Sequence, residues 1–215
     1  MSSTHDATYG STMAEQTPGA STAPAQTPGA PSRSAARERL LGTASALFYA
    51  DGVRAVGVDR VVTEAAVTRA TFYRHFTGKE ALVVAYLDAV DAGVRERAGA
   101  LPDAPDDVAS WLRRLTAQIA DELGRPGFRG CAFINAAAEY PDPASPVRVA
   151  VRQHRDWLQS TATAALARTG HPDPRAAGGR WMTLRDGAMV GAYLGDVEQA
   201  RTTLRAGVED LLAGR

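Results

Sequence analysis

The nine residues from Thr68 to Phe76 constrain the fold most, because they combine capping, basic and aromatic side chains at helical spacing. Thr68 is a good N-cap, since its hydroxyl can accept from an unpaired amide of a first helical turn. Phe72 and Phe76 lie four residues apart and therefore share one face. The opposite face carries Arg69, Tyr73, Arg74 and His75. The stretch predicts a short helix with one apolar stripe and an exposed polar side.

A second short helix is predicted just before it, because apolar residues recur at helical spacing from Val58 to Ala65. Residues 64–67 form the tight turn between the two. Two short helices joined in this way, the second exposing Arg and Tyr, indicate a helix-turn-helix. We therefore expect Arg69 and its neighbours to read DNA in a major groove.

The remaining chain repeats the helical spacing, with Pro and Gly as breaks and no alternating strand pattern. Further helices are expected from Ala35 to Asp51, from Lys79 to the break at Gly99, around 108–119, and over 132–139, 147–169, 175–194 and 196–213. The fold class is therefore all-α, with about nine helices.

Three parts are expected along the chain. Residues 1–32 are Ser, Thr, Ala, Pro, Gly and Gln with almost no large apolar side chain, so burial would not offset their ordering entropy and we predict a disordered tail. The tail has no basic residue, which disfavours a DNA-contacting arm. The helix-turn-helix domain is expected over 33–78, and a longer helical domain over 79–215.

The charge of the chain is unevenly distributed although the formal net charge is zero. Residues 33–79 hold eight basic and four acidic side chains, a net charge of +4, whereas the segments before and after each carry −2. The positive excess coincides with the predicted helix-turn-helix, as a phosphate-binding surface requires.

Lys79 is the only lysine beside twenty-three arginines, and it stands in the first turn of a predicted helix. The helix dipole disfavours a cation there, so an anion such as a DNA phosphate is expected nearby. The alternative is an ordinary solvated lysine.

Several function classes are disfavoured. No run of eighteen apolar residues exists and no secretory signal is recognisable, so we expect a cytoplasmic protein. The single cysteine, Cys131, excludes an internal disulfide and a Cys-rich metal site. A buried small residue is its simplest interpretation, because a redox sensor would need exposure and a lowered pKa.

Catalysis is not expected. The four histidines lie in no zinc spacing, nucleophile motif or phosphate loop: His5, His75, His154 and His171. The acidic residues offer no pair for acid and base roles. We therefore predict a protein that is not an enzyme and that has no cofactor and no metal.

The last two predicted helices each have an apolar face. Trp181, Leu184, Ala188 and Gly191 share one face, and Val197, Leu204, Val208 and Leu211 share another. These faces either complete the core of a monomer or meet a second copy as a four-helix bundle.

The segment from Gly52 to Leu82 resembles the DNA-binding region of the TetR family of transcriptional regulators, above all in Tyr73-Arg74-His75-Phe76 followed by Lys79-Glu80. The resemblance implies that Arg69, Ala70 and Thr71 face base edges and that Tyr73, His75 and Lys79 hold phosphates, with Thr68 and Arg74 in the same DNA-binding set. It also implies a double-stranded operator, a homodimer through about 175–213, and a small-molecule effector in the C-terminal helices.

Two positions depart from the family pattern. Gly57 stands where a Ser or Thr usually caps the first helix of the pair, and Ala66 stands where a Gly usually makes the turn. Gly caps tolerably, but Ala66 in a left-handed conformation would be strained.

Polar residues among aromatics and methionines suggest where an effector binds. The expected residues are Trp111, Phe133, Asn135, His154, Trp157, Met182, Arg185 and Met189. The alternative is core packing, with a satisfied His154 and a surface pair between Arg185 and Asp186.

The sequence thus predicts a repressor that binds a palindromic operator and is released by a small molecule. A helical ligand-binding or adaptor protein that has lost DNA binding is the alternative, which the basic Arg69, Arg74 and Lys79 disfavour.

Overall fold

The computed structural model describes residues 33–214, which form nine α-helices and no β-strand. The helices are α1 Arg33–Asp51, α2 Val58–Glu64, α3 Arg69–His75, α4 Lys79–Ala98, α5 Pro105–Leu123, α6 Ala132–Glu139, α7 Pro146–Arg168, α8 Pro174–Leu194 and α9 Val197–Leu212. The predicted all-α class is confirmed over this range. The expected tail, residues 1–32, lies outside the described residues.

Capping sets the starts of the last three helices. Ser145, Asp173 and Asp196 each accept from an amide in the first turn of α7, α8 and α9. Pro146 and Pro174 stand first in α7 and α8, where a missing N–H costs nothing. All three helices therefore begin within one residue of the predicted positions.

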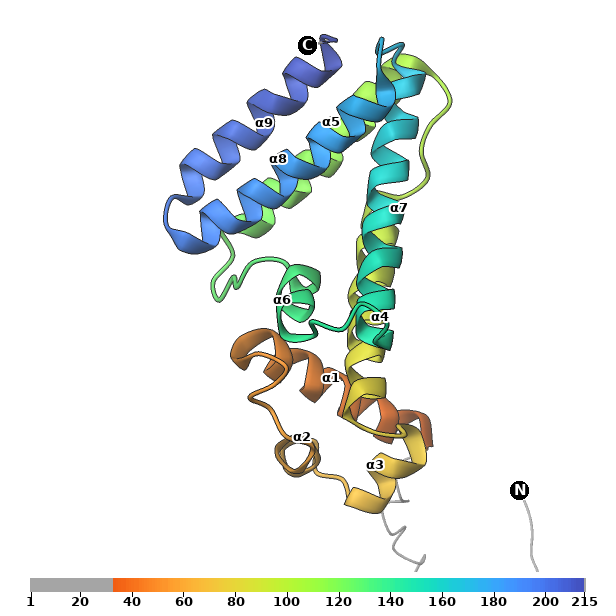
Figure 1. Cartoon of the computed structure of the whole chain (residues 1–215), viewed down its shortest axis with the longest axis vertical. Coiled ribbons are helices and arrows are strands. Elements are labelled where there is room, and N and C mark those ends of the chain that lie inside the picture. Colours follow the sequence, from red (N-terminus) through yellow and green to blue (C-terminus); the bar gives the residue numbers. More distant parts are fainter. Residues whose placement is uncertain (1–32, 215) are drawn as a thin grey trace, which may run out of the picture. The chain divides into compact units, whose positions relative to one another are not determined.

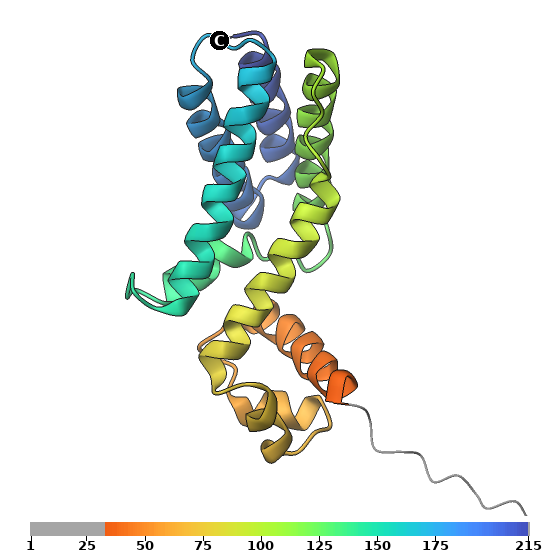
Figure 2. The ribbon, with the colours of Figure 1, turned by 90° about the vertical axis from the view of Figure 1, so that its right-hand side faces the viewer.

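The first three helices pack around a small apolar core. Leu40 and Phe48 of α1, Val61 of α2 and Phe72 of α3 are buried in it, and Leu82 of α4 is buried with them. Figures 1 and 2 show α4 continuing from these helices into the C-terminal ones, where it packs against α7. One helix is therefore common to both parts of the described chain.

The two apolar faces of the closing helix pair differ. Leu204, Val208 and Leu211 of α9 are buried within the chain, as is Trp181 of α8, and α9 packs against α5 and α8. Leu184 is only half-buried and lines an outer groove. The apolar stripe of α9 thus completes the core of the chain, and only part of the α8 face remains available to a partner.

None of the described helices is long and apolar enough to cross a membrane. Among the described residues, no three His, Cys, Asp or Glu side chains gather as a metal site would require.

Candidate functional site

Helix α3 is anchored by its cap and by two aromatic side chains. Thr68 Oγ1 accepts from the Thr71 amide at 3.1 Å, so the predicted N-cap is confirmed. Phe72 and Phe76 are buried, with ring centroids 5.8 Å apart. The exposed residues are Arg69, Ala70, Tyr73 and Arg74. The helix therefore turns its polar face to the solvent, while the aromatic pair holds it to the core.

Arg69 forms an exposed ion pair with Asp59. Its Nη1 lies 2.9 Å from Asp59 Oδ1, and the two side chains are 61% and 76% exposed. An exposed pair contributes about 0–1 kcal/mol, so another acceptor can replace Asp59 at little cost. Thr71 lies in the first turn of the same helix, and its hydroxyl is 2.9 Å from the hydroxyl of Thr68. A guanidinium in a weak, exposed ion pair, beside a methyl and a hydroxyl, has the chemistry that recognises base edges.

The three side chains expected at phosphates have different surroundings. Tyr73 is 52% exposed. Lys79 is half-buried; burial lowers its pKa, and its Nζ donates to the Arg54 carbonyl at 3.3 Å. The Nε2 atom of His75 is buried and has no partner in the described part of the chain, so a phosphate contact by His75 would need its other ring nitrogen.

The start of α4 offers donors next to Lys79. Its N-cap is Gly78, which provides no side-chain acceptor for the amides of the first turn. Such amides, together with the positive end of a helix of 20 residues, suit an anion. The arrangement is compatible with the predicted anion site at Lys79, which stays a prediction.

Both departures from the family pattern have visible consequences. Gly57 is the N-cap of α2 and makes no side-chain cap, as a residue without a side chain must. Ala66 has a φ of 51°, the left-handed conformation expected for the turn before α3. Gly normally occupies this region because a Cβ clashes with the following backbone. The predicted strain at Ala66 is therefore present.

A cavity of about 390 Å³ lies among α1, the end of α5, and helices α4, α6, α7 and α8. Four of the eight residues expected at the effector line it: Phe133, His154, Arg185 and Met189. The aromatic and aliphatic lining includes Tyr49, Tyr86, Val90, Val94 and Phe128. This size and composition suit a small organic molecule.

The other four expected residues lie outside this cavity. Trp111 is buried elsewhere, its Nε1 donating to the Ala98 carbonyl at 2.7 Å. Asn135 is exposed and donates to the Arg129 carbonyl. Trp157 lies under the guanidinium of Arg95, and Met182 is core. Trp111 and Met182 are thus buried in the core and Asn135 faces the solvent, so the polar and aromatic pattern alone did not place these side chains at the cavity.

Several lining residues were not predicted from the sequence. Tyr86, Val90 and Val94 recur every four residues on α4, and this spacing could have identified them. Tyr49 lies on α1, in the expected DNA-binding part, and no sequence signal relates it to the C-terminal helices.

His154 is held by a hydrogen bond at one ring nitrogen and by stacking on one ring face. Its Nδ1 lies 2.6 Å from Asp91 Oδ1, and the ring stacks on Phe133 with centroids 3.6 Å apart. Burial lowers the pKa of His154 to about 4, so the imidazole is neutral and Nδ1 donates to the carboxylate. Its Nε2 is buried without a partner among residues 33–214. The alternative of a satisfied His154 therefore holds for Nδ1 and not for Nε2 within this range.

Arg185 is buried beside the single thiol. The side chain of Arg185 is 8% exposed, with Nη1 2.8 Å from Asp186 Oδ1 and Nη2 3.3 Å from Cys131 Sγ. The pair with Asp186 exists, but it is not the surface pair that the alternative assumed. Cys131 is buried, as predicted.

Helix α6 connects the cavity to the first helices. At its start, the Tyr49 hydroxyl donates to the Gly130 carbonyl and accepts from the Arg129 amide, both at 3.0 Å. At its end, the Glu139 carboxylate accepts from the amides of Val53 and Arg54, at 2.9 and 2.5 Å. The loop between α1 and α2 is thus held by the helix that carries Phe133.

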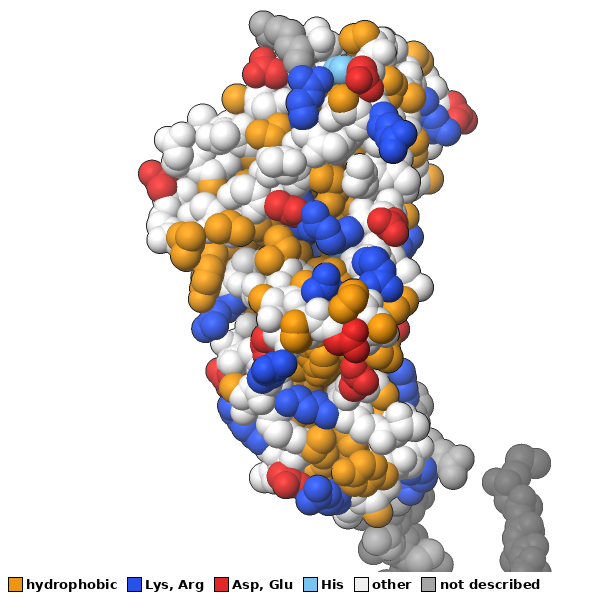
Figure 3. Space-filling view, viewed as in Figure 1, with side chains coloured by type: hydrophobic (Ala, Val, Ile, Leu, Met, Phe, Trp, Pro, Cys, Tyr) orange, Lys and Arg blue, Asp and Glu red, His pale blue; other side chains and the backbone are white. Residues whose placement is uncertain are grey.

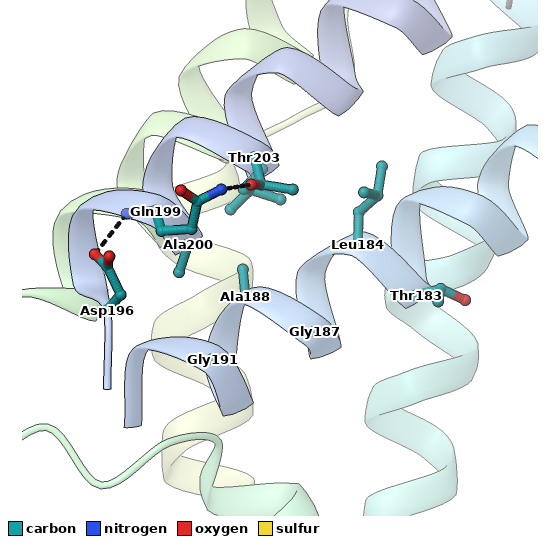
Figure 4. A pocket seen from close by; sticks show the side chains of 10 residues that line it. Thr183, Leu184, Gly187, Ala188, Gly191, Asp196, Gln199, Ala200 and Thr203 are labelled. Carbon is teal, nitrogen blue, oxygen red and sulfur yellow. Dashed lines mark hydrogen bonds between the residues drawn. The ribbon is translucent and has the colours of Figure 1, made fainter. Parts of the chain in front are cut away.

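An outer groove of about 350 Å³ runs between α8 and α9. Figure 4 shows Leu184, Gly187 and Gly191 of α8 facing Gln199 and Thr203 of α9. A Cβ built on Gly187 meets nothing within 4 Å, so this part of α8 is open. Small side chains of this kind allow another helix to approach closely.

Exposed apolar side chains continue beyond the groove at the end of α8. Val190, Tyr193 and Leu194 are 44%, 47% and 76% exposed. Figure 3 shows an apolar patch at the left of this face. A contiguous patch of this kind often marks an interface.

The comparisons with known proteins agree with this geometry. A profile described as bacterial regulatory proteins, tetR family, matches residues 40–86, from α1 into α4. The chain is 25% identical over 146 residues to the HTH-type transcriptional regulator LmrA of Bacillus subtilis (strain 168), covering 65% of this chain and 76% of LmrA.

Two solved structures are similar over most of their length. SCO4454, a TetR-family transcriptional regulator from Streptomyces coelicolor, is 49% identical, with a TM-score of 0.79 over 84% of this chain and 95% of that one. A TetR regulator (sav143) from Streptomyces avermitilis is 27% identical, with a TM-score of 0.69 over 81% and 98%. The chain therefore belongs to the TetR family, a non-enzymatic family of DNA-binding transcriptional regulators.

Proposed function

We propose that this chain is a repressor that binds a palindromic operator as a homodimer in the cytoplasm and releases it when a small molecule occupies the cavity. Residues 33–78 are assigned to DNA binding, and residues 79–215 to effector binding and dimerisation. One observation carries the proposal: α6 lines the cavity and also holds the loop between α1 and α2 through Glu139.

The DNA contacts are assigned by exposure and chemistry. Arg69, with Ala70 and Thr71, would contact base edges, and a guanidinium on one guanine contributes roughly 1–3 kcal/mol of discrimination. The remaining DNA-binding residues, on phosphates or beside them, are Thr68, Tyr73, Arg74, His75 and Lys79. Phosphate contacts add affinity and salt dependence without sequence preference.

The groove between α8 and α9 is the proposed dimer interface. Its Gly and Ala positions and the apolar patch at Val190, Tyr193 and Leu194 support a helix pair packing on its symmetry mate. Two copies would double the DNA contacts across a palindrome, with half-sites about 34 Å apart or a multiple of the helical turn.

Release is proposed to act through α4 and α6, because both line the cavity, α4 packs against α1, and α6 holds the loop between α1 and α2 through Glu139. An effector shifts the equilibrium only by its differential affinity for the DNA-bound and released arrangements. Changing the position of α6 would change the restraint that Glu139 places on Val53 and Arg54.

Fluorescence anisotropy with the DNA upstream of the chain's own gene tests the proposal. Purified protein should bind this duplex more tightly than a scrambled duplex, and fractionated cellular metabolites should include one that weakens binding. Equal affinity for both duplexes would favour the adaptor protein instead. Affinity that no fraction changes would remove ligand-gated release.

A further inference from the structure

We propose that the cavity binds an apolar molecule carrying one anionic oxygen group, a carboxylate in the simplest case, and that this group contacts Arg185. The inference deepens the proposed function and rests on its assignment of the cavity as the effector site.

Arg185 is a buried cation whose charge is only partly compensated. Its exposed fraction is 6%, and its carboxylate partner within residues 33–214 is Asp186, at 2.8 Å. The other carboxylate oxygen of Asp186 lies 2.7 Å from Arg155 Nη2. Two guanidinium groups therefore share one carboxylate. A buried charge without full compensation is costly, so an additional anion at Arg185 would be stabilising.

The remaining partner of Arg185 is weak. Its Nη2 donates to Cys131 Sγ at 3.3 Å, and a thiol sulfur is a poor acceptor beside an oxygen anion. Cys131 and Arg185 both line the cavity. A carboxylate entering the cavity could take over this donor with a charge-assisted hydrogen bond.

The charged side chains of the lining agree with an anionic ligand. They are Arg97, Arg185 and Glu122, which gives the lining a net charge of +1. Glu122 also has Arg125 as a neighbour, at 4.0 Å. A cation would meet two arginines and one carboxylate, and a purely apolar ligand would leave the charge of Arg185 only partly compensated.

The rest of the wall determines the body of the molecule. Tyr86, Val90, Val94, Phe128, Phe133 and Met189 line the same cavity. These side chains suit an aromatic or branched apolar skeleton. The ligand is therefore amphipathic, with its anionic group at one side of a mainly apolar cavity.

His154 adds a second polar feature. Because Nδ1 donates to Asp91 and the pKa is about 4, the buried Nε2 is an unprotonated acceptor. His154 lines the cavity too. Nε2 itself is covered, so a ligand donor would reach it only if the side chains over it moved, and recognition of the acid rests on Arg185.

The test compares probes with the same ring and different charge. Isothermal titration and thermal shift would be measured with 2-naphthoate, neutral 2-naphthamide and 2-naphthylmethylammonium, and with decanoate and decanamide as an aliphatic pair. An acid should bind at least roughly tenfold more tightly than its amide, because a charge-assisted hydrogen bond is lost. The ammonium probe should not bind.

Variants assign the preference to Arg185. Arg185→Gln should bind acid and amide alike, whereas Arg180→Gln, which changes an exposed arginine on the same helix, should keep the preference. Equal binding of acid and amide to the unsubstituted protein would overturn the proposal, as would no binding of either acid at millimolar concentration. Survival of the preference in Arg185→Gln would also overturn it. The probe comparison needs no variant, so misfolding of Arg185→Gln leaves the proposal testable.

Operator binding is measured separately, by anisotropy of the full chain with and without the tightest acid. An acid that binds the protein but leaves the operator bound supports the site and removes ligand-gated release. Failure to bind operator without any acid counts against DNA binding and leaves the titrations interpretable.

Discussion

Ala66 is the residue whose backbone is strained, with a φ of 51° in the turn between α2 and α3. A residue with a Cβ is strained by about 1–2 kcal/mol in this region. Gly avoids this strain, although it loses more chain entropy on folding than Ala does. We expect Ala66→Gly to raise the free energy of unfolding by about 1 kcal/mol, measured by urea denaturation.

A matched exchange in regular helix should have the opposite sign. Ala89 is exposed within α4, and Ala89→Gly should lower stability by about 1 kcal/mol. Destabilisation by Ala66→Gly comparable to that of Ala89→Gly would mean that the turn is not strained.

Arg69 and Lys79 are predicted to affect DNA binding in different ways. Arg69→Ala should remove most of the preference for operator over scrambled DNA and leave weak general binding. Lys79→Ala should weaken binding to every sequence and reduce the salt slope by about one unit, because one phosphate contact is lost. Anisotropy titrations at several salt concentrations measure both quantities. An unchanged slope would remove Lys79 from the phosphate contacts, and full specificity in Arg69→Ala would remove Arg69 from base recognition.

His154 makes stability depend on pH. Burial lowers its pKa from 6.5 to about 4, with Arg185 and Arg95 acting in the same direction and Asp91 opposing them. Between these values the unfolded chain binds a proton that the folded chain does not, so stability falls as the pH falls. The loss from pH 7 to pH 5 is about 2 kcal/mol.

Urea midpoints at the two pH values test this expectation. His154→Gln should be less stable at pH 7 but should lose clearly less stability at pH 5 than the unsubstituted chain. Hydrogen bonds with His154 and Arg95 lower the pKa of Asp91. Protonation of Asp91 therefore lowers stability only below the ordinary pKa of a carboxyl, outside the range from pH 7 to pH 5. Equal losses in the two proteins would assign the pH dependence to other groups.

At the scale of elements, α6 is short but has contacts at both ends. Glu139→Ala removes the acceptor for the amides of Val53 and Arg54. A hydrogen bond to a charged group contributes about 1.5–3 kcal/mol, so exchange of these two amides should become at least roughly tenfold faster. Hydrogen exchange read by mass spectrometry measures it. Glu96→Ala, at an exposed carboxylate of α4, is the control, and equal protection in both variants would show that Glu139 does not hold the loop.

The helices themselves were largely predictable, because spacing and capping are local properties. Thr68 caps α3 as predicted, and α7 and α8 begin at Pro146 and Pro174, one residue before the expected 147 and 175. The cavity was predictable only in part. Phe133 and Arg185 were predicted because polar and aromatic residues lie near each of them on its own helix. Tyr49 belongs to the lining only because α1 packs against a segment distant in the sequence. Trp111 and Met182 were misplaced because periodicity gives a face without saying which helix covers it.

At the scale of the whole molecule, the unit that acts on DNA is expected to be a pair of chains. Four of the large aliphatic side chains of α9 were expected to share one face, and three of these four are buried inside the described chain. The surface available to a second chain is therefore the groove side of α8, where Gly187 and Gly191 leave room for another helix. One copy presents a single α3, and only the pair would fix the spacing of two such helices.

Gly187→Arg tests this arrangement, because a side chain at Gly187 meets nothing within 4 Å of its Cβ in one chain. The variant should fold, but its arginine would occupy the space of the partner helix. Light scattering should show a dimer for the unsubstituted protein and a monomer for Gly187→Arg, and operator affinity should fall by roughly a hundredfold or more, because linked half-sites are lost. Gly42→Arg adds the same side chain to an open position on α1 and should remain dimeric. A dimeric Gly187→Arg with unchanged circular dichroism would place the interface elsewhere.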